Sequence, residues 1–476
     1  MNSSTIRIDN KKSFENELES IQKLNSYQNT EIVISDNKGI NASITKDKKK
    51  FVININAHLN DESHIKPNFS FAINNTIYET KQLENTSSSS QFKVGKSVKS
   101  SSTIGLNTFH SKDFSQISLY KTFFIVDLED IKTFHSQFET ITHERNGTEY
   151  FYNCLRIKIN NFEYDVTQLK DDLNGYFVFE CFEEQSFTDF SEACFSIRQA
   201  IGFINKLMVG GEEFVFDESG QLYYSNYIRP TLRGMYNPIV TNPYSHLDID
   251  IDIAATFIGK LTRISLEVLS NFATKIHNEP EFSTVVLVIL EATDIRSLLI
   301  IPSSFAVIIE LLSKSLSIEE SGLETPITDV NLKNKIIEDF HAIIDENSKN
   351  LSDESILKLK RRVNEINKPI NKQHLSNNEK LTRPFTQLGL PITLHDISII
   401  EHRNDLLHGN VLLKNEDRKT DANINIYMAY VSAKLFTLIS KLILKSIGYD
   451  GYIYNQAKYL EKFMNIKTDE EYFEKI

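Results

Sequence analysis

The residues most able to do chemistry lie close together near the C-terminus, in the run Arg403-Asn404-Asp405-Leu406-Leu407-His408. Histidine titrates near neutral pH and can move protons. Arginine keeps its charge and can hold phosphate oxygens in its planar fork. The asparagine amide both donates and accepts hydrogen bonds. Arg403, Asn404 and His408 therefore carry the groups needed to bind a phosphodiester and to transfer a proton at it.

We expect these three side chains near the end of one helix. Asn404 and His408 are four residues apart and share a helical face. Arg403 and His408 are five apart, which separates them by about 140° at about 100° per residue, although Arg403 is long enough to swing toward that face. His408 would lie in the last turn, where exposed carbonyl groups favour a protonated imidazole, and Gly409 fits the C′ position. Two such helices from two subunits would close a site around one phosphate.

The pattern of Arg403, Asn404 and His408 resembles the R-N-x-x-x-H motif of HEPN domains. These are helical, mostly dimeric, metal-independent ribonucleases, and many belong to bacterial phage-defence and toxin systems. The resemblance covers roughly residues 246–476, where the motif has the form RNDLLHG. The layout, with a β-rich half before such a domain, is similar to that of the ApeA family of abortive-infection proteins.

The resemblance implies an RNA endonuclease in which His408 carries the proton, Arg403 holds the scissile phosphate and Asn404 orients one of them. The RNA 2′-hydroxyl would attack and leave a cyclic phosphate, with no metal or other cofactor. It also implies a homodimer through the helical domain and a phage-derived trigger for the N-terminal domain. One alternative is a non-catalytic HEPN-like module that binds RNA or a partner, and another is the toxin of a toxin–antitoxin pair. In a third alternative, Arg403 forms a surface salt bridge and His408 caps its own helix.

Length and composition are those of a globular protein with two or three domains. The chain has 476 residues, of which 40% are hydrophobic and 24% charged. Its net charge of −12 argues against a protein that coats long nucleic acids, but is compatible with a local basic cleft. The N-terminus lacks the apolar core of a signal peptide, and Glu291, Asp294 and Arg296 interrupt the most apolar stretch. We therefore expect a cytoplasmic protein without a membrane segment.

Hydrophobic periodicity predicts the elements that would position the motif. Residues 1–240 contain strand-like runs separated by turns, which predict a β-rich domain with a mostly antiparallel sheet or sandwich. The runs are Thr30–Ser35, Lys50–Ala57, Phe69–Tyr78, Tyr120–Asp127, Tyr150–Ile159 and Tyr176–Phe182. The Ser-rich residues 84–103 predict an exposed loop, whose Gly95-Lys96-Ser97 lacks the earlier glycine of a P-loop. Phe187–Val209 predicts an amphipathic helix that ends at Gly210.

The remainder of the chain has the period of helices. Arg229–Tyr244 contains three prolines and predicts a linker. Over residues 246–476 the hydrophobic period is 3.6, and about eight helices predict an all-α bundle. Ile253–Phe272 marks one long helix, the motif helix should begin near Asp396, and the longest helix should span Ala422–Ile447. The sequence thus predicts an α+β protein, with a β-rich sensing or regulatory domain before a HEPN-like nuclease domain.

Two groups of potential metal ligands do not predict a metal site. His395, His402 and His408 lack the i, i+4 spacing of a helical zinc pair and are interpreted as unrelated polar histidines. The alternating aspartates in Asp248–Asp252 could bind Mg²⁺, but fit the negatively charged start of a helix better.

Two further features allow a structural and a functional interpretation. The basic run Lys358–Lys372 could follow an RNA backbone, or could form a solvated face with local ion pairs. Glu310 is a carboxylate in the middle of an apolar helix. It either orients a motif residue across the bundle or simply lies on the helix surface.

Overall fold

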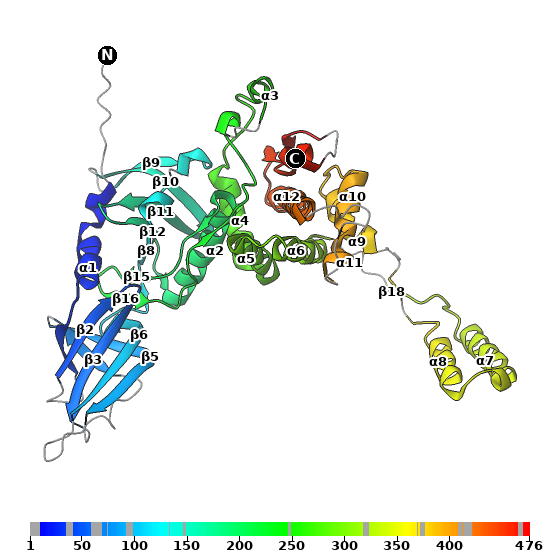
Figure 1. Ribbon diagram of the computed structural model, residues 1–476, viewed down its shortest axis with the longest axis horizontal. Coiled ribbons are helices and arrows are strands. Elements are labelled where there is room, and N and C mark those ends of the chain that lie inside the picture. The colour runs from blue at the N-terminus through cyan, green and yellow to red at the C-terminus, as the bar shows by residue number, and fades with distance from the viewer. Residues whose placement is uncertain are drawn as a thin grey trace. The chain divides into compact units, whose positions relative to one another are not determined.

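The computed structural model describes residues 10–34, 41–58, 69–73, 75–91, 99–132, 134–145, 149–245, 249–317, 323–368, 370–371, 377–407, 412, 421–464 and 470–476. Within these ranges the protein has an α+β fold, with most strands before residue 234 and most helices after residue 250 (Figure 1). The chain forms two compact units, one made of residues 1–312 and 402–476 and the other of residues 313–401. The proposed division between residues 1–240 and 246–476 stays a prediction.

Six antiparallel strands close a small barrel in the first unit, because β6 pairs back to β3 in the order β3-β2-β1-β4-β5-β6. Side chains alternate between the interior and the exterior, so that Ile44 and Lys46 of β2 are buried beside more exposed neighbours. Phe51, Phe71 and Phe109 belong to the core that fills the barrel. The strands are β1 (Thr30–Ile34), β2 (Asn41–Asp47), β3 (Lys50–His58), β4 (Ser70–Ile73), β5 (Thr76–Gln91) and β6 (Lys99–Ser111).

The prediction of an exposed loop over the Ser-rich residues 84–103 is wrong for most of that range. Residues 84–91 extend β5, and residues 99–103 belong to β6, with Ser90 opposite Ser100. The physical reason is that residues 99–103 have a hydrogen-bonded neighbour on both sides, β3 and β5, which a single-sequence pattern does not reveal. Gly95-Lys96-Ser97 lies outside the described residues.

An antiparallel sheet continues from β6 in the order β16-β15-β8-β12-β11-β10-β9. All seven residues of its central strand β12 are buried, because helices cover both faces. Phe14, next to α1, packs edge-on against Phe123, while Phe190 of α2 packs against Tyr120 and Tyr164. The strands are β8 (Lys121–Val126), β9 (Ile141–Arg145), β10 (Glu149–Ile159), β11 (Phe162–Lys170), β12 (Gly175–Cys181), β15 (Glu213–Phe216) and β16 (Leu222–Ser225), and the helices are α1 (Glu15–Asn25) and α2 (Phe187–Asn205). The predicted antiparallel sheet is thereby confirmed.

Helix α2 ends earlier than its apolar pattern predicts. Lys206 follows it in the left-handed conformation, with φ of 62°, and so ends the helix before Gly210. The next residues form one of four short strand pairs in the described part of the chain. These pairs are β14 (Leu207–Met208) with β17 (Leu232–Arg233), β7 (Ile117–Ser118) with β13 (Gln185–Ser186), β18 (Leu323–Glu324) with β19 (Ile370–Asn371), and β20 (Tyr452–Tyr454) with β21 (Phe473–Lys475).

The single helix expected over Ile253–Phe272 is divided in two. Gly259 between the halves has a φ of +76°, which a continuing helix does not allow. The Ser265 hydroxyl then caps α4 by accepting a hydrogen bond from the Val268 N–H. Besides α1 and α2, the first unit holds the helices α3 (Ile251–Thr256), α4 (Leu266–Asn278), α5 (Pro280–Ile295), most of α6 (Ile300–Leu316), α11 (Arg403–Leu407), α12 (Asp421–Ser446) and α13 (Ala457–Met464). The second unit holds α7 (Val330–Glu346), α8 (Asp353–Asn364), α9 (Asn377–Gln387) and α10 (Leu394–Glu401).

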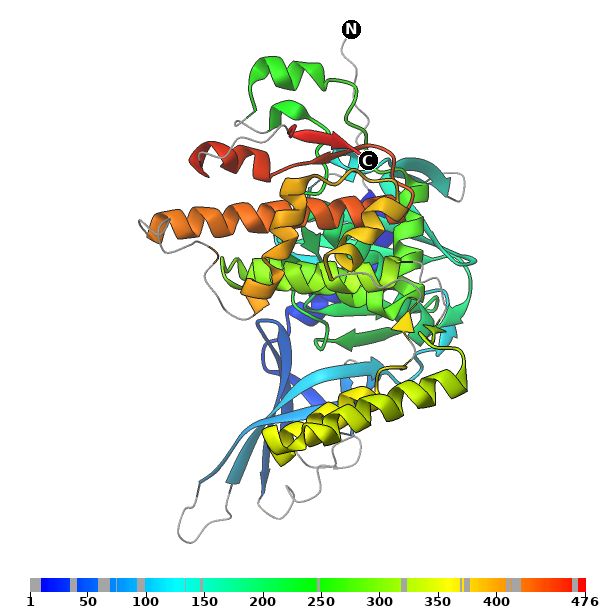
Figure 2. The ribbon, with the colours of Figure 1, turned by 90° about the vertical axis from the view of Figure 1, so that its right-hand side faces the viewer.

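Helix α12 is the longest described helix and lies beside the strand pair β20–β21 (Figure 2). It begins and ends within one residue of its predicted bounds. Among the described residues, its segment Asn423–Ser446 alone is long and apolar enough to cross a membrane, but 83% of the tested window is buried inside the structure. This is the burial of a core helix.

Candidate functional site

The motif begins at a break between two helices. α10 ends at Glu401, His402 is a turn residue, and α11 begins at Arg403, so the single helix expected from Asp396 is interrupted. The Leu406 N–H donates to the His402 carbonyl and starts a new series of helical hydrogen bonds.

The structure describes the three predicted site residues to different extents. Arg403 is the first residue of α11 and is described in full. Asn404 is placed by its backbone in the first turn of the same helix. His408 and Gly409 lie outside the described residues, directly after the helix end at Leu407. The chemical roles of Arg403, Asn404 and His408 stay a prediction.

Arg403 forms an ion pair with Glu310 of α6. Its Nε and Nη2 atoms both donate to Glu310 Oε2, over 3.1 and 2.5 Å. The Arg403 side chain is 21% exposed and that of Glu310 51%. Such a half-exposed pair stabilises a protein by only about 0–1 kcal/mol. Its main consequence is geometric, since two donors on one edge of the guanidinium fix the plane of the group.

The contact with Arg403 agrees with the interpretation in which Glu310 orients a motif residue. It also agrees with the alternative in which Arg403 forms a surface salt bridge. The two interpretations differ in what a neutral residue at position 310 does to activity.

We expect Glu310→Gln to lower the rate of RNA cleavage by roughly 10–100-fold, the usual effect of removing a partner that orients a site residue. The amide has the size of the carboxylate but no charge, so the melting temperature should change little. Cleavage kinetics of the purified protein measure this effect. Glu281→Gln, at an exposed position on the neighbouring α5, is the matched control. An unchanged or faster rate in Glu310→Gln would show that the Arg403–Glu310 pair is only a surface salt bridge.

A second contact beside Arg403 joins the break to α12. His402 Nε2 lies 2.7 Å from the Tyr427 hydroxyl, and the two rings meet edge to face, with centroids 5.9 Å apart. Tyr427 stacks on Tyr430, one turn later in α12. The interpretation of His402 as unrelated to the motif does not account for this contact. A partly exposed ring such as Tyr427 can stack on an RNA base, whereas Tyr430 is buried and supports Tyr427 from inside.

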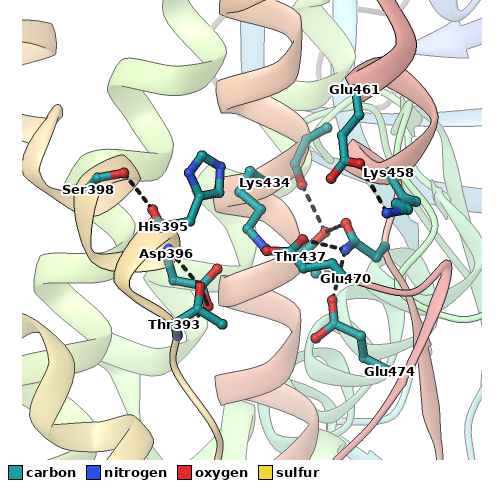
Figure 3. Close-up of polar contacts among 12 residues, drawn as sticks. Thr393, His395, Asp396, Ser398, Lys434, Thr437, Lys458, Glu461, Glu470 and Glu474 are labelled. Carbon is teal, nitrogen blue, oxygen red and sulfur yellow. Dashed lines mark hydrogen bonds and ion pairs between the residues drawn. The ribbon is translucent and has the colours of Figure 1, made fainter. Parts of the chain in front are cut away.

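Helix α12 is anchored by a buried network of charges, part of which Figure 3 shows. Lys434 Nζ lies 2.5 Å from Glu470 Oε1, and these side chains are 0% and 9% exposed. Two turns later on the same face of the helix, Lys441 Nζ lies 2.5 Å from Glu474 Oε2, with side chains 3% and 19% exposed. The Asn455 amide donates to both glutamates, over 2.9 and 2.8 Å. The C-terminal segment therefore neutralises two lysines of the helix that carries Tyr427.

Two other buried charges lie in the β-rich part and serve packing. Arg198 of α2 donates through Nε to the Val209 carbonyl, and its guanidinium lies 4.4 Å from the Phe124 ring centroid. Burial lowers the pKa of Arg198 to about 10, and the Glu213 carboxylate opposes this shift. Burial likewise raises the pKa of Glu213, against the effect of Arg198. The opposite charges of Arg198 on α2 and Glu213 on β15 thus partly offset the cost of burying each other.

A lysine surrounded by aromatic rings joins the barrel to the rest of the sheet. Lys46 of β2 pairs with Glu212, which also accepts a 2.7 Å hydrogen bond from the Tyr224 hydroxyl. Its ammonium group lies 4.2 Å from the centroid of Phe51 and 5.3 Å from that of Tyr224. Burial lowers the pKa of Lys46, and the charge of Glu212 opposes this shift. These contacts fix β2 against β16 and involve no motif residue.

The described residues contain no cluster of three or more His, Cys, Asp or Glu side chains that could hold a metal ion. Asp250 caps α3 by accepting from the Asp252 N–H over 2.8 Å, as the interpretation of this run as a helix start requires. In the basic run, Lys358 pairs with Glu354 and Lys368 with Glu365, which are the local ion pairs of the structural interpretation. Neither group thus adds a ligand to the motif.

Comparison of the chain with protein-family models, with curated proteins and with solved structures gives no match. The site is therefore interpreted from its own residues.

Proposed function

We propose that this protein is a metal-independent RNA endonuclease of the HEPN type. The single observation that supports this most is the ion pair that fixes the Arg403 guanidinium at the start of α11. In the proposed reaction His408 takes the proton of an RNA 2′-hydroxyl, whose oxygen attacks the adjacent phosphorus. The 5′-oxygen leaves and takes up a proton, and a 2′,3′-cyclic phosphate remains. Arg403 stabilises the charge that develops on the phosphate oxygens, and Asn404 orients His408 or the phosphate.

The biological role that we propose is anti-phage defence by abortive infection in the bacterial cytoplasm. It rests on the resemblance of the motif and of the layout to those families. In this role the β-rich part, with its closed barrel, recognises a phage-derived trigger and restrains the nuclease until the trigger binds. The active form is a homodimer, as the resemblance to HEPN domains implies, in which the motif of a second subunit completes the site.

The proposal is tested by incubating the purified full chain with total RNA. We expect cleavage that leaves cyclic phosphate ends and that His408→Ala abolishes.

Cleavage should persist in EDTA, because proton transfer and charge stabilisation both come from motif side chains. Rates with and without the chelator, measured on the same RNA, test this prediction. Activity that disappears in EDTA and returns with Mg²⁺ or Mn²⁺ would exclude the HEPN mechanism for this protein.

A non-catalytic RNA-binding module is the second candidate, and the partly exposed Tyr427 ring beside the motif favours it. Stacking of bases on aromatic rings gives binding that needs no general acid or base. In that case the protein binds single-stranded RNA without cutting it. Tyr427→Leu would then weaken binding, while His408→Ala would have no effect.

A further inference from the structure

The second unit contains a helical hairpin whose two ends are held together. α7 and α8 run antiparallel, and the short strands β18 and β19 pair at the base of the hairpin. There the Ile327 N–H donates to Asn367 Oδ1 over 2.8 Å, and the Asn367 amide donates back to the Ile327 carbonyl over 3.0 Å. The hairpin is thus a module of its own between α6 and α9.

Few contacts hold the two helices to each other. His341 of α7 lies 2.9 Å from the Asn364 side chain of α8, and Lys360 pairs with Asp345 over 2.5 Å. Ile344 is the one buried residue of α7, and α8, which the structure describes in full, has none. Helices of about 12–15 residues are marginal in water and depend on the burial of an apolar face. Contacts within the hairpin do not provide that burial.

One side of the hairpin is apolar and exposed. At about 100° per residue, Leu332, Ile336, Phe340 and Ile343 form a stripe on α7, roughly 100–180° around the helix from His341, which contacts α8. Leu359 of α8 is displaced by a similar angle from Lys360 and Asn364, and Ile366 follows two residues after the end of α8. Because the helices are antiparallel, both sets lie on the same side. We call this set the hairpin apolar face. Within this face, Leu332 is 50% exposed, Phe340 42% and Ile343 54%.

Charge divides the hairpin along its length. At the tip, where α7 ends and α8 begins, four acidic side chains accompany three basic ones, two of which already pair with Glu354 and Asp345: Asp345, Glu346, Asp353 and Glu354 with Lys349, Lys358 and Lys360. At the base, five basic side chains accompany two acidic ones: Lys333, Lys335, Arg361, Arg362 and Lys368 with Asp329 and Glu365. When the apolar faces of two hairpins pack together and the tip of each lies over the base of the other, each acidic tip meets a basic base. A tip-to-tip arrangement would bring like charges together.

We propose that the hairpin apolar face is a homodimerisation surface, on which the same face of a second copy packs tip to base in a four-helix bundle. The arrangement has a two-fold axis. Both apolar stripes are therefore buried, and each charged end lies against an end of opposite charge. α7 then lies antiparallel to its own copy, with Lys333 and Lys335 near the partner's acidic tip. The axis passes near Phe340, which lies midway between these lysines and Asp345.

The size of the surface predicts the strength of the dimer. A helix of 17 residues is about 25 Å long, and two helices side by side are about 20 Å wide. The interface would bury roughly 1,000 Å² in total, which is at the lower limit for a specific interface. Association should therefore depend on concentration in the micromolar range, where sedimentation can follow it. This inference does not rest on ribonuclease activity.

Substitutions on the two sides of the hairpin separate the proposal from general surface effects. In the full chain, we expect Phe340→Glu with Ile343→Glu to weaken self-association at least about tenfold. Leu357→Glu, on the opposite side of α8 and with a 72% exposed native residue, should have no effect. Circular dichroism checks that both variants remain helical. A solution mass that is the same for the wild type and the face variant would overturn the proposal.

A cysteine near the axis reports on this interface alone, even if the chain also dimerises through its motif. Phe340→Cys should form an intermolecular disulfide under mild oxidation, because the two copies of residue 340 would be adjacent. Leu357→Cys is the control and should remain monomeric on a non-reducing gel. The native cysteines are all buried, so they should not interfere. Equal cross-linking of both variants would contradict the tip-to-base dimer.

Exchange of the charges tests the orientation. One chain carries Asp345→Lys and Glu346→Lys, and the other carries Lys333→Glu and Lys335→Glu. Alone, each chain places like charges at both ends of the interface and should associate more weakly than the wild type. Mixed, the two chains are complementary at both ends and should form a heterodimer. A mixture that associates no better than its components, or RNA binding that changes while the mass does not, would overturn the proposal.

Discussion

Replacing His408 by alanine should lower the rate of RNA cleavage by roughly 10²–10⁴-fold, the usual loss for a general acid–base group. Arg403→Ala should be comparable, because the developing phosphate charge then lacks its counter-ion. Arg403→Lys should restore little, since an ammonium group cannot reproduce the planar fork held by Glu310. Asn404→Ala should be milder, because that side chain only orients another group.

The same variants should remain folded. The Arg403–Glu310 pair is half exposed, so its loss should shift the melting temperature by only a few degrees. Single-turnover cleavage and thermal unfolding, measured on the same preparations, separate chemistry from stability. Asp405→Ala is the matched control, at an exposed position between the motif residues on α11. Variants that unfold, or that fold and cleave normally, would make the motif structural and favour the RNA-binding module.

Removing one charge of the buried network should have the largest effect on stability. Lys434→Ala leaves the Glu470 carboxylate buried opposite an apolar side chain, and breaking such a pair costs about 3–5 kcal/mol. This is a large part of the roughly 5–15 kcal/mol that holds a typical domain together. We therefore expect a melting temperature lower by about 5–15 °C. Glu470→Ala should act similarly, and it also removes an acceptor of the Asn455 amide.

Two controls isolate the effect of burial. The double variant Lys434→Met with Glu470→Gln should recover most of the stability, because it leaves no unpaired charge and keeps an acceptor for Asn455. Lys358→Ala breaks an ion pair whose side chains are 72% and 76% exposed, and should change stability by less than about 1 kcal/mol. Equal losses in Lys434→Ala and Lys358→Ala would show that the network is not stabilised by its burial.

The amino-acid sequence by itself determined the elements that depend on local periodicity. The runs that became β3, β8, β10 and β12 alternate or carry aromatic and β-branched residues, and α12 lies within one residue of its predicted bounds. These predictions hold because the composition and length of each run are typical of its element, with aromatic and β-branched residues in the strands and a long apolar stretch in α12. The spacing of Arg403, Asn404 and His408 is likewise visible without any structure. The prediction of one helix over Ile253–Phe272 was wrong, because a left-handed glycine and a serine cap divide it.

The tertiary structure decided every feature whose partners are distant in the sequence. The closure of the barrel by β3 and β6, which turns a Ser-rich run into strands, depends on a neighbour some fifty residues away. The pairs Arg403–Glu310 and Lys434–Glu470 join side chains that are far apart in the sequence. The free energy of such contacts depends on burial and on the distance between charges, and both arise only when the chain is folded.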